Sequence, residues 1–218
     1  MVLPHSVMLQ VNMMNLSKKS TCRFLESIKL EDGFFSALSY HQARIDETRQ
    51  HFYPEAPTIS LPLALMKQGK IPPKGLYKAR VLYSESIEEI EFVPYKPREV
   101  ATLKLIEATC DYAFKYEKRP VLNTLFQQKG KCDDILITQN GYLTDTTIAN
   151  IALLKDGIWY TPEKPLLKGT KRAALLHHQL ITEAQLHQDQ LAEFEAIRLF
   201  NAMIEFGEIE LPIRHIIR

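Results

Sequence analysis

Apolar positions in the first half of the chain indicate one helix with short strands on either side. Leu38, Ile45 and Phe52 lie seven residues apart within residues 37–52, so they fall on one face of a helix. Runs rich in β-branched and aromatic residues indicate strands around it. These runs cover residues 24–28, 79–83 and 87–92. The pattern predicts a small unit of mixed α and β structure.

Turn dipeptides divide the second half into shorter elements. Asn140-Gly141 and Asp156-Gly157 are typical of tight hairpin turns. The strands that they join cover residues 133–138 with 142–145, and 148–155 with 158–161. Further strands are expected at residues 102–108, 182–185 and 196–200, and helices at 120–129, 170–180 and within the acidic stretch 183–195. The fold class is therefore predicted to be α+β.

A proline-containing segment separates the two halves. Pro94 and Pro97 interrupt the strand pattern, which indicates a connection between domains. We expect a small N-terminal domain at residues 23–97 and a larger one at 98–218. Residues 1–22 match neither pattern and are interpreted as a poorly ordered extension or an upstream start.

Composition excludes several classes of protein. The 218 residues carry 27 Lys and Arg against 26 Asp and Glu, so a formal charge of +1 argues against a nucleic-acid partner. Three cysteines without metal-ligand spacing indicate free thiols in a reducing compartment. No apolar run approaches the length of a membrane span, and the start lacks the order of a signal peptide. A cytoplasmic protein is expected.

Residues 167–172 form a candidate phosphate site, because they precede an apolar-periodic helix. The first N–H groups of a helix lack partners and attract anions, and Gly169 allows close approach of the backbone beside Thr170 and Lys171. The alternative is a loop that only begins the helix.

Asp145 is the one acid in a neutral run of small residues, so burial would require a cationic partner. A protonated pyridine nitrogen would pair with it. The alternative is a turn that Asp145 caps through Thr146 or Thr147.

Lys115 lies between Phe114 and Tyr116, where loss of water would lower its pKa and activate the amine. The alternatives are a surface lysine at 115, or Lys118 in the same role. No metal site is expected, since His177 and His178 are adjacent on a helix and face different directions.

The order of these elements carries a family resemblance over residues 100–205. The elements are Asp133-Asp134, Asn140-Gly141, Thr144-Asp145, Asn150, Trp159-Tyr160-Thr161-Pro162 and Gly169-Thr170-Lys171-Arg172. Together they resemble the class IV aminotransferases, the pyridoxal 5′-phosphate (PLP) enzymes of fold type IV. That family contains branched-chain and D-amino-acid aminotransferases and 4-amino-4-deoxychorismate lyases. Tyr40-His41-x-x-Arg44 is more faintly similar to the family's phosphate-binding arginine segment.

The resemblance implies a two-domain fold like that of D-amino-acid aminotransferase, with PLP on Lys115 as a Schiff base. Lys115 and Arg119 are similar to the Lys-x-x-x-Arg of the lyase branch, which Lys118 does not match. Asp145 stands where the family has a glutamate facing the pyridine nitrogen. The remaining implied roles are phosphate binding by Arg44, Gly169, the N–H groups of Thr170 and Lys171, and Asn201; support by Asn150; and substrate binding by Arg80 and Arg119.

The resemblance also implies a reaction on an amino-acid-like small molecule. Lys115 would act as the base at the α-carbon, and Asp145 would keep the ring nitrogen protonated. We expect an aminodeoxychorismate lyase of folate biosynthesis, which releases pyruvate and forms 4-aminobenzoate. The alternatives are an aminotransferase for branched-chain or D-amino acids, or a non-catalytic PLP-binding partner subunit. A homodimer is expected from the family.

Overall fold

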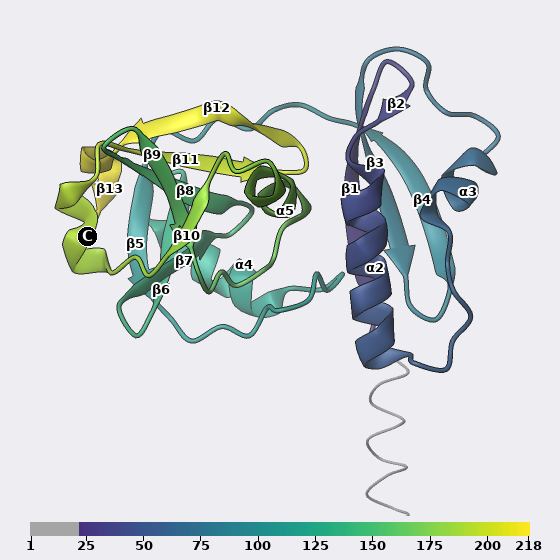
Figure 1. The fold of residues 1–218 in the computed structure, drawn as a ribbon, viewed down its shortest axis with the longest axis horizontal. Helices are drawn as coiled ribbons and strands as arrows, with labels where there is room; N and C mark the ends of the chain where they lie inside the picture. Colours follow the sequence, from purple (N-terminus) through teal and green to yellow (C-terminus); the bar gives the residue numbers. More distant parts are fainter. Residues whose placement is uncertain (1–21) are drawn as a thin grey trace, which may run out of the picture.

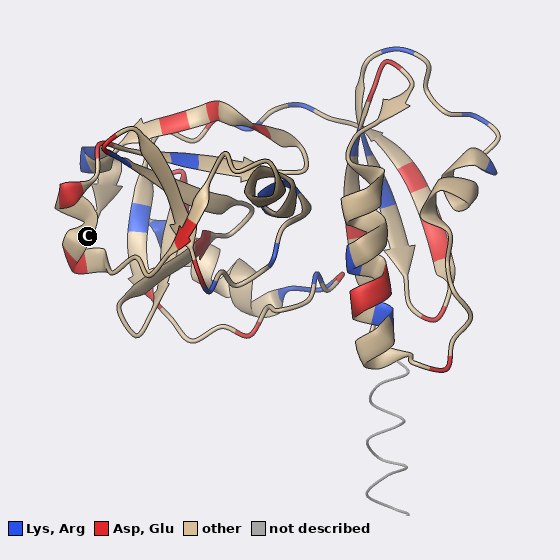
Figure 2. Cartoon of the chain, viewed as in Figure 1, with Lys and Arg blue, Asp and Glu red and all other residues tan. Residues whose placement is uncertain are grey.

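The computed structural model describes residues 22–218, which form two lobes, each built on its own sheet (Figure 1). Most of the predicted extension at residues 1–22 therefore lies outside the described residues. Basic and acidic positions are interspersed along both lobes (Figure 2).

The small lobe is a four-stranded sheet with strand order β2-β1-β3-β4. Its elements are β1 (Phe24–Glu31), β2 (Phe34–Phe35), α2 (Leu38–Phe52), α3 (Leu61–Met66), β3 (Leu76–Tyr83) and β4 (Ile87–Pro94). One sheet face packs against α2 through fully buried Phe24, Ile28, Val81 and Ile45. Because side chains alternate along a strand, Lys78 and Arg80 of β3 lie on the opposite face.

The large lobe is a nine-stranded mixed sheet. Its strands are β5 (Leu103–Glu107), β6 (Asp134–Gln139), β7 (Tyr142–Thr146), β8 (Asn150–Lys155), β9 (Ile158–Pro162), β10 (Thr182–Ala184), β11 (Ala196–Asn201), β12 (Ile204–Pro212) and β13 (Ile216–Ile217). Its helices are α4 (Pro120–Phe126) and α5 (Thr170–His177), with 3-10 turns η1 (Gln127–Lys129), η2 (Gln188–Glu193) and η3 (Ile213–His215). Its core includes fully buried Leu103, Leu136, Ile151 and Ile197 from four strands.

The two lobes are joined at a second place besides the connection between β4 and β5. The chain between β5 and α4 returns to the small lobe, where Leu25 N donates to Lys115 O and Glu117 N donates to Arg23 O, both at 2.9 Å. An isolated bridge pairs Phe24 with Tyr116 between them. Residues 115–117 thus lie along β1.

Most predicted elements are confirmed within one or two residues, and the differences have local causes. The helix expected to reach residue 180 ends at His177, because Gln179 adopts a left-handed φ of 56° and Leu180 N bonds Leu175 O. In place of the helix predicted within the acidic stretch, the chain forms the 3-10 turn η2. Helix α3, strands β12 and β13 and the turn η3 were not predicted. Helix α3 is short, and the alternation along β12 changes phase near Gly207, which has a φ of +103°.

No helix among the described residues is long and apolar enough to cross a membrane.

Candidate active site

A cavity of about 350 Å³ lies between the lobes and is lined by residues of both. Eight of the residues singled out in the sequence line it: Arg44, Lys115, Arg119, Asp145, Asn150, Gly169, Thr170 and Asn201. Positions more than 150 residues apart in the chain therefore converge on one site.

Lys115 enters the cavity from the segment that returns to the small lobe. Its neighbours Phe114 and Tyr116 pack into the small-lobe core, with ring centroids 6.4 and 5.2 Å from that of Phe24. Burial, followed by the charge of Arg44, lowers the pKa of the Lys115 amine to about 8. Lys118 is exposed and does not line the cavity. The geometry therefore favours Lys115 as the nucleophilic amine.

Asp145 lies on β7, opposite Asn150 of β8 in the hairpin register. Asn150 Nδ2 donates to Asp145 Oδ1 and Leu167 N donates to Oδ2, both at 2.8 Å. Burial raises the pKa of Asp145 to about 7, although both hydrogen bonds oppose that rise. Asp145 does not cap the following turn. Thr146 does so, because its Oγ1 accepts from the N–H groups of Ile148 and Ala149.

The start of α5 faces the same cavity. Gly169 is the N-cap residue, and a Cβ built on it would lie 2.1 Å from Asn150 Oδ1. A glycine is therefore required where this turn meets the amide that holds Asp145. Thr170, the first helical residue, is buried and lines the cavity. The Lys171 side chain lies elsewhere, since its Nζ is 2.5 Å from Glu205.

Arg44 extends from α2 to the cavity, and its guanidinium forms an ion pair with the carboxylate of Glu26. Its Nε donates to Glu26 Oε1 at 2.8 Å, and its Nη2 donates to Oε2. Burial would raise the pKa of Glu26, but Arg44 and His41 outweigh it and lower this pKa to about 2. Arg44 Nη1 makes no hydrogen bond to any residue that the structure describes, so it remains able to bind an anion.

Arg119 and Asn201 fix the tight connection between β7 and β8. Arg119 Nη1 donates to Thr147 O at 2.6 Å, and Asn201 Nδ2 donates to Ile148 O at 2.9 Å. Both side chains line the cavity and shape its wall through these two carbonyls.

Comparison with known proteins agrees with this arrangement. The family model for amino-transferase class IV matches residues 119–211. An uncharacterized protein of Haemophilus influenzae is 32% identical over 189 residues, which cover 82% of this chain and 96% of the relative. A crystal structure of a candidate 4-amino-4-deoxychorismate lyase from Haemophilus somnus is 34% identical with a TM-score of 0.79, covering 84% of this chain and 97% of the other. A candidate aminodeoxychorismate lyase of Schizosaccharomyces pombe is 37% identical over 81 residues, 34% of this chain and 35% of that protein.

The chain belongs to the class IV aminotransferase family. The α+β, fold type IV architecture expected from the sequence is confirmed. The protein is accordingly an enzyme of the PLP-dependent kind, and the alternative of a non-catalytic partner subunit is not supported.

The residues of this class IV aminotransferase fit PLP chemically. A weakly basic amine, a buried carboxylate and a helix start beside an arginine line one cavity, and PLP needs an amine, a ring-nitrogen partner and a phosphate site. The described residues contain no group of three or more His, Cys, Asp and Glu arranged to bind a metal ion.

Arg80, predicted to bind the substrate carboxylate, is placed outside the lining of the cavity. Its guanidinium lies 3.4 Å from Glu91, 3.9 Å from Glu89 and 3.8 Å from Glu117. Three carboxylates therefore already balance the charge of the Arg80 guanidinium, which makes it a poor partner for a substrate carboxylate.

Sequence reasoning missed Lys78, two residues away on the same face of β3. Lys78 lines the cavity, and its amine makes no hydrogen bond or ion pair with any other described residue. Lys96 shares both properties. Because residues two apart on a strand share a face, the sequence could have indicated Lys78 as well as Arg80. Only the tertiary structure shows that carboxylates neutralise the charge of Arg80 and not that of Lys78.

Proposed function

We propose that this enzyme is a 4-amino-4-deoxychorismate lyase, which releases pyruvate and forms 4-aminobenzoate with PLP as cofactor. The observation that carries the proposal is the convergence of Lys115 and Asp145 in one cavity with a helix start. The similarity to candidate lyases from Haemophilus somnus and Schizosaccharomyces pombe favours this reaction within the family.

In this proposal each part of the cofactor has a partner in the chain. Lys115 holds it through the amine, and Asp145 faces its ring nitrogen. Arg44, Thr170 and the first N–H groups of α5 hold its phosphate. When bound, PLP supplies an electron sink for negative charge at the substrate α-carbon.

The chain's own groups perform the proton transfers. With a pKa of about 8, the Lys115 amine is partly unprotonated near neutral pH, so it can accept the α-proton. Asp145 stabilises positive charge at the ring nitrogen, and Asn150 and Leu167 N keep its carboxylate oriented. Burial between the lobes limits water around both groups.

Charge on the cavity wall suits an anionic substrate. Six cationic side chains line it, namely Arg44, Lys78, Lys96, Arg98, Lys115 and Arg119, against the carboxylates of Glu117 and Asp145. Lys115 is assigned to the cofactor, and Arg44, Arg98 and Arg119 hydrogen-bond with described residues. Lys78 and Lys96 make no such bond or ion pair with a described residue, so we propose that they bind substrate carboxylates.

The second candidate is an amino transfer to a keto acid. The family model that matches residues 119–211 is that of aminotransferases, and both reactions begin with the same proton removal by Lys115. The two differ in whether a leaving group departs or the amine stays on the cofactor.

The test begins with visible absorption of the purified protein, borohydride reduction and mass spectrometry of the modified lysine. We expect a pyridoxyl adduct on Lys115, lost in Lys115→Ala and kept in Lys118→Ala. Pyruvate release from aminodeoxychorismate then supports the lyase, whereas amino transfer without pyruvate supports the second candidate. Protein that stays unmodified in excess PLP would contradict both.

A homodimer and a cytoplasmic location remain predictions of the same proposal. Light scattering during size-exclusion chromatography would measure the mass in solution, and fractionation of cells would measure the location.

A further inference from the structure

The segment that carries Lys115 is attached to the small lobe, although the chain enters and leaves it from the large lobe. The hydrogen bonds of Leu25 N and Glu117 N enclose Lys115 and Tyr116 on the edge of β1. This attachment places the lysine backbone against a sheet of the other lobe.

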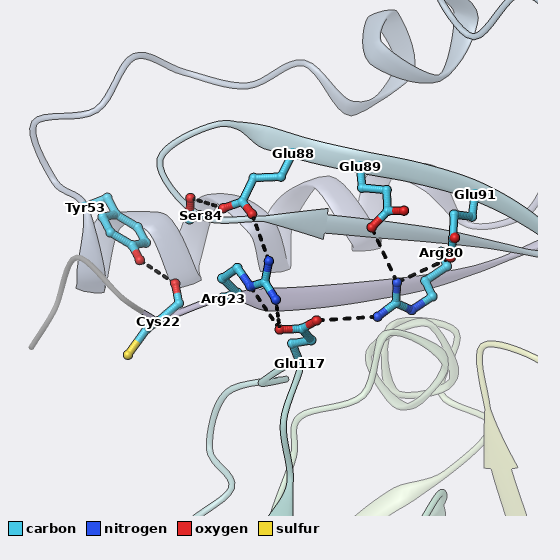
Figure 3. Close-up of polar contacts among 9 residues, drawn as sticks. All are labelled: Cys22, Arg23, Tyr53, Arg80, Ser84, Glu88, Glu89, Glu91 and Glu117. Atoms are coloured by element: carbon cyan, nitrogen blue, oxygen red, sulfur yellow. Dashed lines mark hydrogen bonds and ion pairs between the residues drawn. The ribbon is translucent and has the colours of Figure 1, made fainter.

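A charged cluster reinforces the attachment two residues after the lysine. Glu117 Oε2 lies 2.7 Å from Arg23 Nη2 and 3.0 Å from its Nε, and Oε1 lies 3.8 Å from Arg80 Nη2 (Figure 3). Both arginines also face acids of the β3–β4 hairpin. We call these residues the Glu117 cluster: Arg23, Arg80, Glu88, Glu89, Glu91 and Glu117.

Geometry makes this cluster more than a set of surface ion pairs. An isolated, exposed ion pair contributes little to stability, but the Glu117 side chain is only 18% exposed and lies between two guanidinium groups. Two residues span at most roughly 7 Å of chain, so fixing Glu117 restricts where the Lys115 backbone can lie.

We propose that Glu117 is a positioning residue: held by Arg23 and Arg80, it keeps the Lys115 amine inside the cavity. This inference rests on the proposed function only in taking Lys115 as the residue that holds the cofactor and accepts the α-proton. It also gives Arg80 a role different from substrate binding.

For Glu117→Gln, two explanations predict changes of opposite sign in the pKa of Lys115. The charged groups that act on it are Arg44, Glu26, Arg119 and Lys78. If Glu117 acts only as a charge, Glu117→Gln lowers the pKa of Lys115 and Arg23→Gln raises it. If the cluster positions the segment, either substitution exposes the amine to water and raises its pKa towards the ordinary 10.5.

The experiment is competitive acetylation of the full-length, cofactor-free chain across neutral and alkaline pH, with mass spectrometry of each lysine. It needs neither substrate nor PLP, so a failed lyase assignment leaves its result intact. The unaltered chain should show a Lys115 midpoint near 8. Both Glu117→Gln and Arg23→Gln should raise that midpoint by about one pH unit.

Glu193→Gln is the control for loss of an ion pair, because it breaks one of similar length, 2.8 Å, with Lys155 in the large lobe. It should leave the Lys115 midpoint unchanged. Circular dichroism checks that each variant is folded, and both Glu→Gln substitutions keep a side chain of the same size. A Lys115 midpoint that is unchanged or lowered in Glu117→Gln would overturn the proposal.

Holoenzyme kinetics provide a second readout. Misplacing a reacting group lowers kcat more than substrate binding, so Glu117→Gln should reduce kcat about tenfold with KM changed less than about twofold. Loss of stability without a change in kcat would contradict positioning.

Discussion

Gly169 lies so close to Asn150 that any Cβ at position 169 would fall 2.1 Å from Asn150 Oδ1. The same amide donates through Nδ2 to Asp145 Oδ1 and to Leu167 O, both at 2.8 Å. The glycine at the start of α5 thereby permits the arrangement that holds the buried carboxylate.

Gly169→Ala should weaken PLP binding through displacement of Asn150. We expect at least about tenfold weaker binding in a titration of the visible absorption band, with a loss of roughly 1–3 kcal/mol in the free energy of unfolding. Gly69→Ala is the control, because no described residue other than its chain neighbours comes within 4 Å of its Cβ position. Equal affinities for the two variants would argue against the role of this contact.

Uptake of PLP should depend on the protonation of Lys115. Only the neutral amine attacks a carbonyl, and burial lowers its pKa to about 8. The initial rate of colour formation after mixing cofactor-free protein with PLP should therefore rise with pH and level off above about 8. Stopped-flow absorbance measures this profile, and a midpoint near 10.5 would mean that the amine is solvated.

Asp145 should make the cofactor-free protein less stable as the pH rises. Its pKa is raised from 3.8 to about 7 by folding, so the folded state binds a proton that the unfolded state releases. Stability from this group is present below the unfolded pKa and is lost as the pH rises through about 7.

Urea unfolding of Asp145→Asn and the unaltered chain at several pH values measures this effect. Relative to the unaltered chain, the unfolding free energy of the variant should rise by roughly a few kcal/mol between acid and neutral pH. A difference independent of pH would show that the pKa of Asp145 is the same in the folded and unfolded states. The variant should also lose at least about tenfold in activity, because a neutral amide cannot stabilise a charged ring nitrogen.

Lys78→Met should weaken binding of an anionic substrate. The substitution removes from the cavity wall a cation that pairs with no other described residue, so KM should rise about tenfold, with a smaller change in kcat. Lys74→Met removes an exposed lysine of the preceding loop and should leave both constants unchanged. Equal KM values for the two variants would exclude Lys78 from substrate recognition.

The sequence predicts what is encoded locally. The hairpins at Asn140-Gly141 and Asp156-Gly157 and the helix over residues 38–52 follow from turn chemistry and spacing within a few residues. Asp145 was singled out as the one acid in a neutral run and Asn150 through the family resemblance, and the structure places them opposite each other across one hairpin.

The choice of which of two neighbouring cations is available to a substrate depends on tertiary structure. Lys78 and Arg80 have the same charge and strand face, and only the positions of Glu89, Glu91 and Glu117 distinguish them. Pairing of Glu26 with Arg44 likewise joins two elements whose separation in sequence gives no sign of contact. The end of the helix at His177 depended on a left-handed Gln179, a conformation that residue type does not predict.

Strand β1 hydrogen-bonds with residues 34–35 near one end and with residues 115–117 near the other, so a single edge belongs to both lobes. The connection between β4 and β5 is consequently not the only tie between them. A protease cut within residues 95–102 would leave two fragments that still share this backbone pairing and the aromatic packing of Phe114 and Tyr116. The nicked molecule would remain one particle, and the two pieces expressed separately would be suited to reassemble around the lysine.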